Sequence, residues 1–355
     1  MNHMLSKIEK LLAEGKRLLI YGNAHTAVSV CRLLVDHGFV PSSFVVDRFA
    51  FVPGSRLEGI DVVCMEDIRN KEDYIWVIGF DNPSRTQEII HTFPNVIHFV
   101  DLDGKSSWSD EFLESHKDDL DMITGLLEDD RSRETLRAII HARNTGEYLK
   151  LLDIAEPVQY FNPLTRKNGK GEVFLDCGAF VGDTVLEYVS FNPDYKSIYA
   201  FEPMKENFSK LKNNTVGIRD FQLVSKGVWD TDTQLCFHED TSASSVADSG
   251  EIRIETVAID NLMPEDLEAP VFIKMDVEGA EYEALLGARQ TIERVVPKMA
   301  ICVYHKNEDI MDLFKLIYSF ESGKKYKYYL RHHSNRLSET VLYAIPDDDK
   351  FGVNK

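Results

Sequence analysis

The sequence predicts an α/β protein that contains two open, mainly parallel sheets joined by a helical connector. Short apolar runs alternate with segments of helical periodicity in residues 1–104, and the alternation restarts near residue 172. Alternation of this kind is typical of parallel sheets covered by helices. The chain has 355 residues, which exceeds the usual size of one core, so we expect two domains.

The first series predicts a small Rossmann-like domain over residues 1–104. Its expected helices are residues 4–14 and 27–37, and its expected strands are residues 18–21, 44–47, 61–64, 74–79 and 96–100. Gly22 follows the first strand and Asp47 ends the second, but the G-x-G-x-x-G spacing of dinucleotide-binding turns is missing. We therefore expect a degenerate module for substrate presentation or assembly, including a homodimer. Binding of NAD(P) or a nucleotide sugar by an oxidoreductase stays an alternative.

Residues 105–165 predict a helical connector that also contains a segment able to cover a cofactor. Residues 101–134 carry twelve Asp or Glu residues against four Lys or Arg residues. A solvated helix face is the simplest explanation of this acidity.

The second series predicts a seven-stranded sheet in a domain that spans residues 166–355. We expect strands at residues 173–176, 197–201, 221–225, 271–275, 299–304, 326–331 and 340–345, and helices at residues 183–190, 204–213, 280–294 and 308–320. Residues 227–257 alternate around the Ser-rich turn TSASSVADSG and predict an inserted antiparallel ribbon.

Composition narrows the classes of function. The formal charge is −19, which disfavours binding to nucleic acid or to an anionic membrane. Five scattered cysteines without C-x-x-C spacing predict free thiols. The amphipathic start of the chain is not a signal peptide, and no apolar stretch approaches the ~20 residues of a membrane span. We expect a cytoplasmic protein.

The most informative motif is VFLDCGAFVGDT followed by SIYAFEP, a strand, glycine loop, helix and second strand. Its D-x-G-x-x-x-G-D spelling differs from the turn that holds a pyrophosphate, and Asp183 would repel a phosphate. A cofactor with a ribose, an ammonium and a sulfonium but no phosphate suits these acids better. The sequence therefore predicts S-adenosylmethionine, with Glu202 at the ribose hydroxyls and glycines that let the backbone approach the methionine half.

The carboxyl ends of parallel strands meet at one edge, so further groups join this prediction. The expected cofactor-binding residues are Asp176, Gly178, Ala179, Gly182, Asp183, Thr184, Glu202, Pro203, Ser225, Gly227 and Asp276. The alternative is that Asp176 and Asp183 cap a helix and Glu202 is an exposed acid at a strand end.

A second motif, KMDVEGAE, places Asp276 and Glu278 at the tip of another strand. Two carboxylates there can act as a general base, orient a substrate hydroxyl, or bind Mg²⁺. Acids at a helix N-terminus that the macrodipole favours are the structural alternative. Whether a metal is needed stays open.

Together, DCGAFVGDT, YAFEP, KMDVEGAE, ICVYHKNEDI and RHHS resemble the FkbM-type family of S-adenosylmethionine-dependent methyltransferases over roughly residues 125–345. The resemblance implies a class I methyltransferase sheet and O-methylation of a hydroxyl, often on a sugar or polyketide. It also implies that the cofactor loop is the DCGAFVGDT segment and that Lys274, Asp276 and Glu278 form the catalytic side. His305 stands where many members have Glu, so the identity of the base stays open.

The ordinary pKa of a histidine suits a general base that removes a proton from a hydroxyl group. His305 could equally cap the following helix. His332, His333 and Tyr160 are weaker candidates for substrate contact. The complete prediction is a small-molecule methyltransferase, with a carbohydrate as the expected substrate. A scaffold that keeps the cofactor fold without activity is the remaining alternative.

Overall fold

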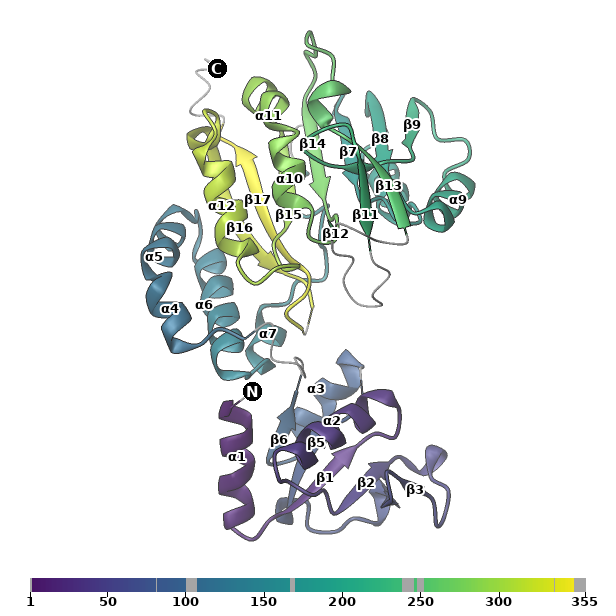
Figure 1. Ribbon diagram of the computed structural model, residues 1–355, viewed down its shortest axis with the longest axis vertical. Helices are drawn as coiled ribbons and strands as arrows, with labels where there is room; N and C mark the ends of the chain where they lie inside the picture. Colours follow the sequence, from purple (N-terminus) through teal and green to yellow (C-terminus); the bar gives the residue numbers. More distant parts are fainter. Residues whose placement is uncertain are drawn as a thin grey trace. The chain divides into compact units, whose positions relative to one another are not determined.

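The computed structural model describes residues 2–80, 82–99, 107–166, 170–237, 246–247, 252–334 and 336–347. The chain divides into two compact units. The first comprises Met1–Glu114, Arg137–Asp153 and Asn335–Leu337, and the second comprises Ser115–Leu136, Ile154–Ser334 and Ser338–Lys355. Each unit is built on its own sheet (Figure 1). The domain boundaries at residues 104 and 165 stay predictions.

The first unit contains a six-stranded sheet in the order β3-β4-β2-β1-β5-β6. Its strands are β1 (Arg17–Tyr21), β2 (Ser43–Val46), β3 (Arg56–Leu57), β4 (Ile60–Cys64), β5 (Tyr74–Ile78) and β6 (Val96–His98). The pairs are parallel except for β3 with β4. The chain moves outward from β1 in both directions, as in doubly wound sheets.

Helices cover both faces of this sheet because alternate strand residues point to opposite sides. Ile8 of α1 (Asn2–Ala13) and Leu34 of α2 (His25–Asp36) pack with Ile20 in one buried cluster. Phe93, directly after α3 (Pro83–Thr92), packs with Trp76 in the cluster on the other face.

The second unit contains a seven-stranded sheet in the order β16-β17-β15-β14-β7-β8-β9. Its strands are β7 (Val173–Cys177), β8 (Ser197–Phe201), β9 (Phe221–Val224), β14 (Val271–Met275), β15 (Lys298–Cys302), β16 (Tyr326–His332) and β17 (Thr340–Pro346). Only β17 runs antiparallel to its neighbours. The seven strands and the final hairpin confirm the predicted class I methyltransferase sheet.

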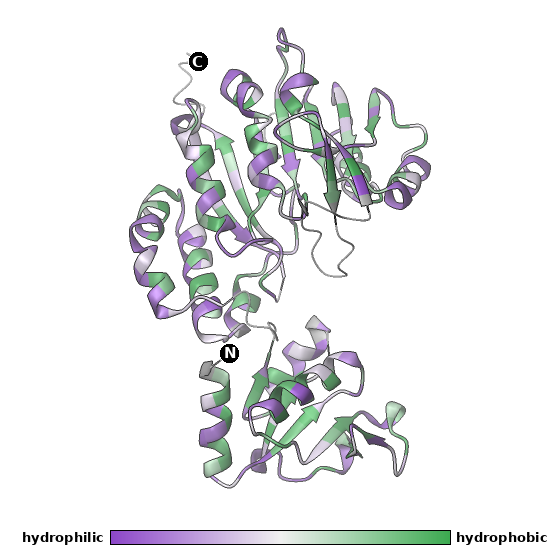
Figure 2. Ribbon diagram, in the orientation of Figure 1, coloured by the Kyte–Doolittle hydropathy of each residue, from purple (hydrophilic) through white to green (hydrophobic). Residues whose placement is uncertain are grey.

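The helices that connect the strands of this sheet also cover it, and they are α8 (Asp183–Phe191), α9 (Lys205–Asn214), α10 (Glu281–Leu286), α11 (Arg289–Val295) and α12 (Asp309–Ser319). Figure 1 shows α10, α11 and α12 on one face of the strands. Tyr188 of α8 and Leu211 of α9 pack with Phe174 and Phe272 in a separate cluster. Hydrophobic colour follows the strands in Figure 2, whereas outer faces of the helices are hydrophilic.

The segment expected to be a helical connector contains α4 (Asp110–Ser115), α5 (Lys117–Leu126), α6 (Asp130–Thr145) and α7 (Leu149–Ile154). The expected ribbon is a four-stranded sheet of β10 (Gly227–Val228), β11 (Gln234–Phe237), β12 (Val246–Ala247) and β13 (Ile252–Val257) in the order β10-β13-β11-β12. β11 pairs antiparallel with β13 and β12, as predicted. Most of the Ser-rich turn lies outside the described residues.

The single helix predicted for residues 280–294 is wrong, because the structure has two helices that meet at Gly287. A Cβ atom on Gly287 would lie 2.0 Å from the carbonyl oxygen of Trp229, so another part of the chain passes directly against it. The Asp260 carboxylate accepts hydrogen bonds from the backbone N–H groups of Gln290 and Thr291 and thereby begins α11.

We expect Gly287→Ala to destabilise the second unit by about 1–3 kcal/mol, since its Cβ atom must displace backbone rather than a flexible side chain. Gly125 in α5 is the matched control, because nothing lies within 4 Å of a Cβ built there. Gly125→Ala should stabilise the protein by about 0.5–1 kcal/mol. Urea denaturation of both variants measures the difference, and equal midpoints would contradict the close approach at Gly287.

All five cysteines are free thiols, as the sequence predicts, and four of them are buried. Within the described part of the chain, no helix is both long enough and apolar enough to cross a membrane.

Candidate functional site

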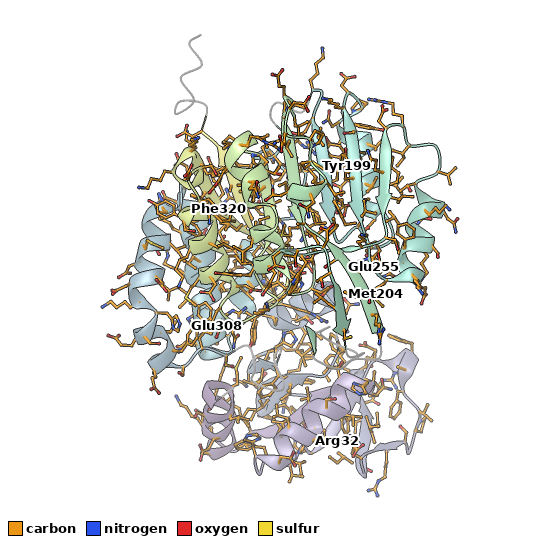
Figure 3. The ribbon with its side chains drawn as sticks, turned by 45° about the horizontal axis from the view of Figure 1, so that its top comes forward. Arg32, Tyr199, Met204, Glu255, Glu308 and Phe320 are labelled. Carbon is orange, nitrogen blue, oxygen red and sulfur yellow. The ribbon has the colours of Figure 1, made fainter. Side chains whose placement is uncertain are left out.

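The glycine loop after β7 and the acid after β8 meet at the carboxyl edge of the seven-stranded sheet. The Phe180 N–H donates to Glu202 Oε2 at 3.0 Å, and the Met204 N–H donates to Glu202 Oε1 at 2.9 Å. Met204 precedes α9 and is labelled in Figure 3. Burial raises the pKa of Glu202, although these N–H donors oppose that rise. The two strand ends predicted to share one site therefore lie together.

Gly178 is needed at this edge because of its contact with β14. It has φ +82°, and a Cβ atom there would lie 1.8 Å from the Asp276 carbonyl oxygen. Gly182, which precedes α8, has φ +89°, and a Cβ atom there would lie 2.8 Å from the side-chain atom Cδ1 of Leu211 in α9. Both glycines therefore make close contacts with other residues of this chain. Their expected contact with a cofactor stays a prediction.

Asp176 and Lys274 form a buried ion pair below the glycine loop. Lys274 Nζ lies 3.1 Å from Asp176 Oδ1, and both side chains are almost fully buried. The ammonium also donates to the Gly178 carbonyl at 2.7 Å. Burial raises the pKa of Asp176 to about 6, against the lowering effect of Lys274. Because no part of Asp176 is exposed, the structure assigns it a supporting position under the loop.

The other predicted cofactor residues follow the same edge. Ala179 is buried, whereas Asp183 is exposed as the first residue of α8 and precedes the half-buried Thr184. Pro203, Ser225 and Gly227 also belong to this edge. The Glu202 N–H donates to Val224 O directly before the exposed Ser225, and a Cβ atom on Gly227 would lie 3.8 Å from Pro203 Cγ.

Asp276, directly after β14, accepts hydrogen bonds from tyrosines of two other segments. The Tyr160 hydroxyl donates to Asp276 Oδ2 at 3.0 Å, and the Tyr304 hydroxyl donates to Asp276 Oδ1 at 3.3 Å. Tyr160 precedes the sheet in sequence, yet its hydroxyl reaches the tip of a central strand. The Tyr304 hydroxyl also lies 3.4 Å from Glu339 Oε1. Asp276 is thus surrounded by hydroxyl donors at the centre of the edge.

His305 is enclosed by carboxylates. Its Nδ1 lies 2.9 Å from Glu281 Oε1, and its Nε2 lies 3.5 Å from both Asp276 Oδ1 and Glu278 Oε2. Burial lowers the pKa of His305, but the bond to Glu281 and the other two carboxylates outweigh it and raise the pKa to about 9. The ring is therefore a cation near pH 7, which is opposite to the state that the predicted base requires.

His332 and His333 do not reach the group around Asp276. His332 is completely buried, and its Nδ1 lies 2.9 Å from the Thr340 hydroxyl. His333 lies between Glu156 O and the Tyr343 hydroxyl, so it supports the segment that contains Tyr160. We therefore correct the expectation that His332 contacts substrate, because its ring has no exposed surface.

The sequence interpretation missed four members of this group. Tyr304 is the second residue after β15, and Glu281 lies inside the KMDVEGAE motif, so both had a positional signal. Gln159 and Glu339 had no such positional signal in the sequence. Gln159 Nε2 donates to Glu339 Oε2 at 2.7 Å, although the two residues are far apart in sequence.

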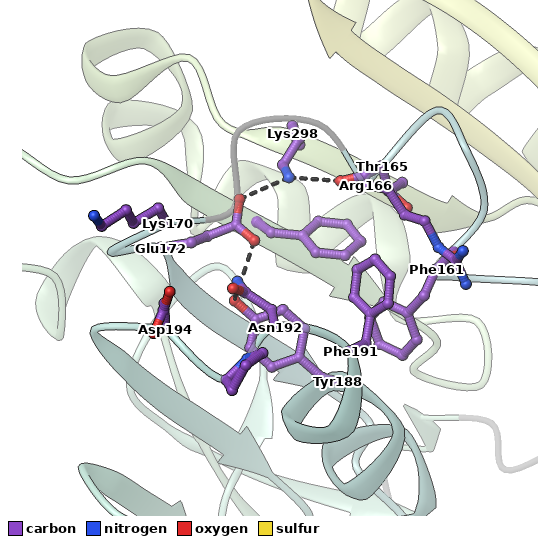
Figure 4. A pocket seen from close by; sticks show the side chains of 12 residues that line it. Phe161, Thr165, Arg166, Lys170, Glu172, Tyr188, Phe191, Asn192, Asp194 and Lys298 are labelled. Atoms are coloured by element: carbon purple, nitrogen blue, oxygen red, sulfur yellow. Dashed lines mark hydrogen bonds and ion pairs between the residues drawn. The ribbon is translucent and has the colours of Figure 1, made fainter.

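A cavity of about 300 Å³ lies at the opposite, amino-terminal edge of the sheet (Figure 4). Glu172 and Lys298 form a buried ion pair of 2.7 Å there, and the Tyr188 hydroxyl donates to Glu172. None of the predicted site residues lines this cavity. The cavity is therefore separate from the site that the motifs predict.

In the first unit, the carboxylate of Asp47, directly after β2, accepts hydrogen bonds from two neighbouring side chains. The Tyr21 hydroxyl and Arg85 Nη2 donate to the same oxygen, Oδ1, at 2.5 and 2.7 Å. An acid at this position would have to accept the ribose hydroxyls of NAD. Its present partners disfavour that alternative.

The comparisons agree with the resemblance. Residues 176–333 match the family described as Methyltransferase FkbM domain. The chain is similar to the crystal structure of Methyltransferase FkbM from Methylobacillus flagellatus KT, with 22% identity, a TM-score of 0.73, and coverage of 95% of this chain and 93% of that chain.

Two weaker similarities are to other solved structures. An rRNA methylase from Streptococcus thermophilus has 14% identity, a TM-score of 0.36, and coverage of 54% of this chain and 97% of that one. Fibrillarin from Aeropyrum pernix, with natively bound S-adenosyl-L-methionine, has 13% identity, a TM-score of 0.32, and coverage of 51% and 69%. No protein with a curated description matches the chain. Residues 176–333 of this chain thus match the FkbM methyltransferase domain, and nearly the whole chain has the fold of the solved Methyltransferase FkbM.

Proposed function

We propose that the second unit is an S-adenosylmethionine-dependent O-methyltransferase that acts on a hydroxyl group of a sugar or a related small metabolite. The observation that carries the proposal is the junction of Glu202 with the Phe180 N–H, at the edge of a sheet whose sequence matches a methyltransferase family.

The described residues fit the cofactor by charge and by donor type. Glu202 has a carboxylate held in place by two backbone donors, which leaves lone pairs for a pair of ribose hydroxyls. Asp183 is exposed at the start of α8 and offers an acid for the ammonium group. An acidic loop without a basic side chain suits a cofactor that has no phosphate.

When bound, S-adenosylmethionine would supply an electrophilic methyl group for the acceptor oxygen, and its sulfonium would become a neutral thioether. The chain must align the acceptor, exclude water and take up one proton. Asp276 is the group we assign to orient the hydroxyl and receive its proton, because its carboxylate is partly exposed among hydroxyl donors. Tyr160 and Tyr304 fix that carboxylate.

The charge of the site favours a small neutral or cationic acceptor. Asp276, Glu278 and Glu339 lie close to the proposed acceptor position, and the whole chain has a formal charge of −19. A polyanion would be repelled from this edge. A carbohydrate meets this requirement for a neutral acceptor, because its hydroxyl groups are uncharged.

Isothermal titration with S-adenosylhomocysteine is the direct test. We expect saturable binding of one ligand per chain in the micromolar range, and no heat from NADH. Absence of binding at millimolar S-adenosylhomocysteine would overturn the proposal. Saturable NADH binding would instead favour the oxidoreductase alternative in the first unit. A screen of sugars with methyl-labelled S-adenosylmethionine then identifies the acceptor.

A further inference from the structure

Phe180 lies in the turn that the glycine loop makes between β7 and α8. The Gly182 N–H donates to the Ala179 carbonyl at 2.8 Å and closes this turn around Phe180 and Val181. Phe180 has φ +46°, a left-handed conformation that glycine adopts freely and that is an outlier for a bulky residue. The sequence therefore has phenylalanine where the backbone favours glycine.

The surroundings of the turn hold Phe180 in this conformation. At the start of the loop, a Cβ atom on Gly178 would lie 1.8 Å from the Asp276 carbonyl oxygen, so the loop packs directly against the backbone after β14. The Phe180 N–H is also fixed, because it donates to Glu202 Oε2 at 3.0 Å. Strained backbone persists where neighbouring structure determines it in this way, and it is concentrated at ligand sites.

Packing within the chain does not explain why phenylalanine occupies this position. The side chain of Phe180 is 55% exposed, whereas its neighbour Ala179 belongs to the buried cluster of the sheet. Within the described part of the chain, neither an aromatic ring nor a cationic side chain contacts the Phe180 ring. Glycine would relieve the backbone and would expose less apolar surface. The ring is therefore available to a ligand at this edge.

The place of Phe180 in the loop indicates which part of the cofactor it meets. Its N–H fixes Glu202, the acid assigned to the ribose hydroxyls, and Gly178 and Gly182 on either side are expected at the methionine half. The sulfonium joins these two halves. We propose that the Phe180 ring forms the wall of the site beside that sulfonium, where its face attracts the positive charge. This inference rests on the proposed function.

An aromatic wall at this place would distinguish the methyl donor from the product. S-adenosylmethionine has a sulfonium cation, whereas S-adenosylhomocysteine has a neutral thioether, and a ring face attracts only the cation. The contacts expected at Glu202 and Asp183 involve ribose hydroxyls and an ammonium, which both molecules share. The Phe180 ring therefore adds a preference for the donor that these acids do not supply.

The test is calorimetry of the full chain with S-adenosylmethionine and, separately, with S-adenosylhomocysteine. Phe180→Leu keeps the apolar bulk and the backbone N–H but removes the aromatic face. We expect it to weaken binding of S-adenosylmethionine about 3–30-fold and binding of S-adenosylhomocysteine less than about twofold. Phe180→Tyr keeps the aromatic face and should bind both molecules as the wild type does.

Phe180→Gly separates the role of the ring from the stability of the fold. Glycine suits φ +46°, so this variant should unfold at the temperature of the wild type or higher, although it binds both molecules more weakly. Asp220→Gly is the matched control, because Asp220 has φ +47° and a side chain that is 58% exposed, directly before β9 at the opposite edge of the sheet. It should leave both affinities unchanged.

The outcomes distinguish this inference from the proposed function. If Phe180→Leu weakens binding of both molecules equally, or of neither, the ring does not face the sulfonium and the inference is overturned, while binding by the wild type still supports the proposed function. If the wild type binds neither molecule, the proposed function is overturned and this inference with it.

Discussion

Replacing Lys274 with methionine should lower the free energy of unfolding of the second unit by about 3–5 kcal/mol. The change leaves the Asp176 carboxylate buried without its cation, and it also removes the donor to Gly178 O. The pKa of Asp176 is already raised by burial to about 6 and should rise further, so the acid would take up a proton near pH 7. Chemical denaturation followed by circular dichroism measures the loss.

A double variant and a surface variant make this prediction specific. Asp176→Leu together with Lys274→Met removes both charges, so it should be more stable than Lys274→Met alone. Lys210→Met is the control, because its partner Glu206 is exposed and such a pair contributes roughly 0–1 kcal/mol. Additive effects of the two buried substitutions would show that Asp176 and Lys274 do not depend on each other.

Glu202→Gln should weaken binding of S-adenosylhomocysteine by about 10–100-fold while leaving the fold intact. The amide keeps the shape of the side chain, but it is uncharged, and its NH₂ group replaces one of the two acceptor oxygens of the carboxylate. Loss of a hydrogen bond to a charged acceptor costs about 1.5–3 kcal/mol, which is the stated change in affinity.

Calorimetry at constant salt measures that affinity. Glu206→Gln is the matched control, since Glu206 lies on α9 two residues after Met204 and its side chain is 82% exposed. It changes the net charge equally and should alter affinity less than about twofold. If both variants bind equally well, Glu202 does not contact the cofactor.

Much of the fold was predictable because its signals are local. Strand ends at Asp176, Glu202 and Asp276 follow apolar runs, and the parallel pairing of β7, β8 and β14 then brings those ends together. The break at Gly287 was not predictable, because it depends on where Trp229 passes in space. The hydrophobic periodicity of a sequence does not predict a tertiary contact of this kind.

The site was predictable only in part, for the same reason. Lys274 and Asp176 have residue types that suit a ligand, yet their pairing buries both of them. Glu339 lies in the turn between β16 and β17, and only the tertiary fold places it beside Tyr304. The charge of His305 depends on three acids of the KMDVEGAE motif, and only the tertiary fold brings His305 to all three of them.

The position of β17 has a consequence for folding of the protein. This last strand lies inside the sheet, between β15 and β16, and Glu339 directly precedes it. Until β17 has paired, the chain exposes an unpaired edge of β15. We therefore expect the sheet to close and Glu339 to reach Tyr304 in the same folding step, when β17 docks between β15 and β16.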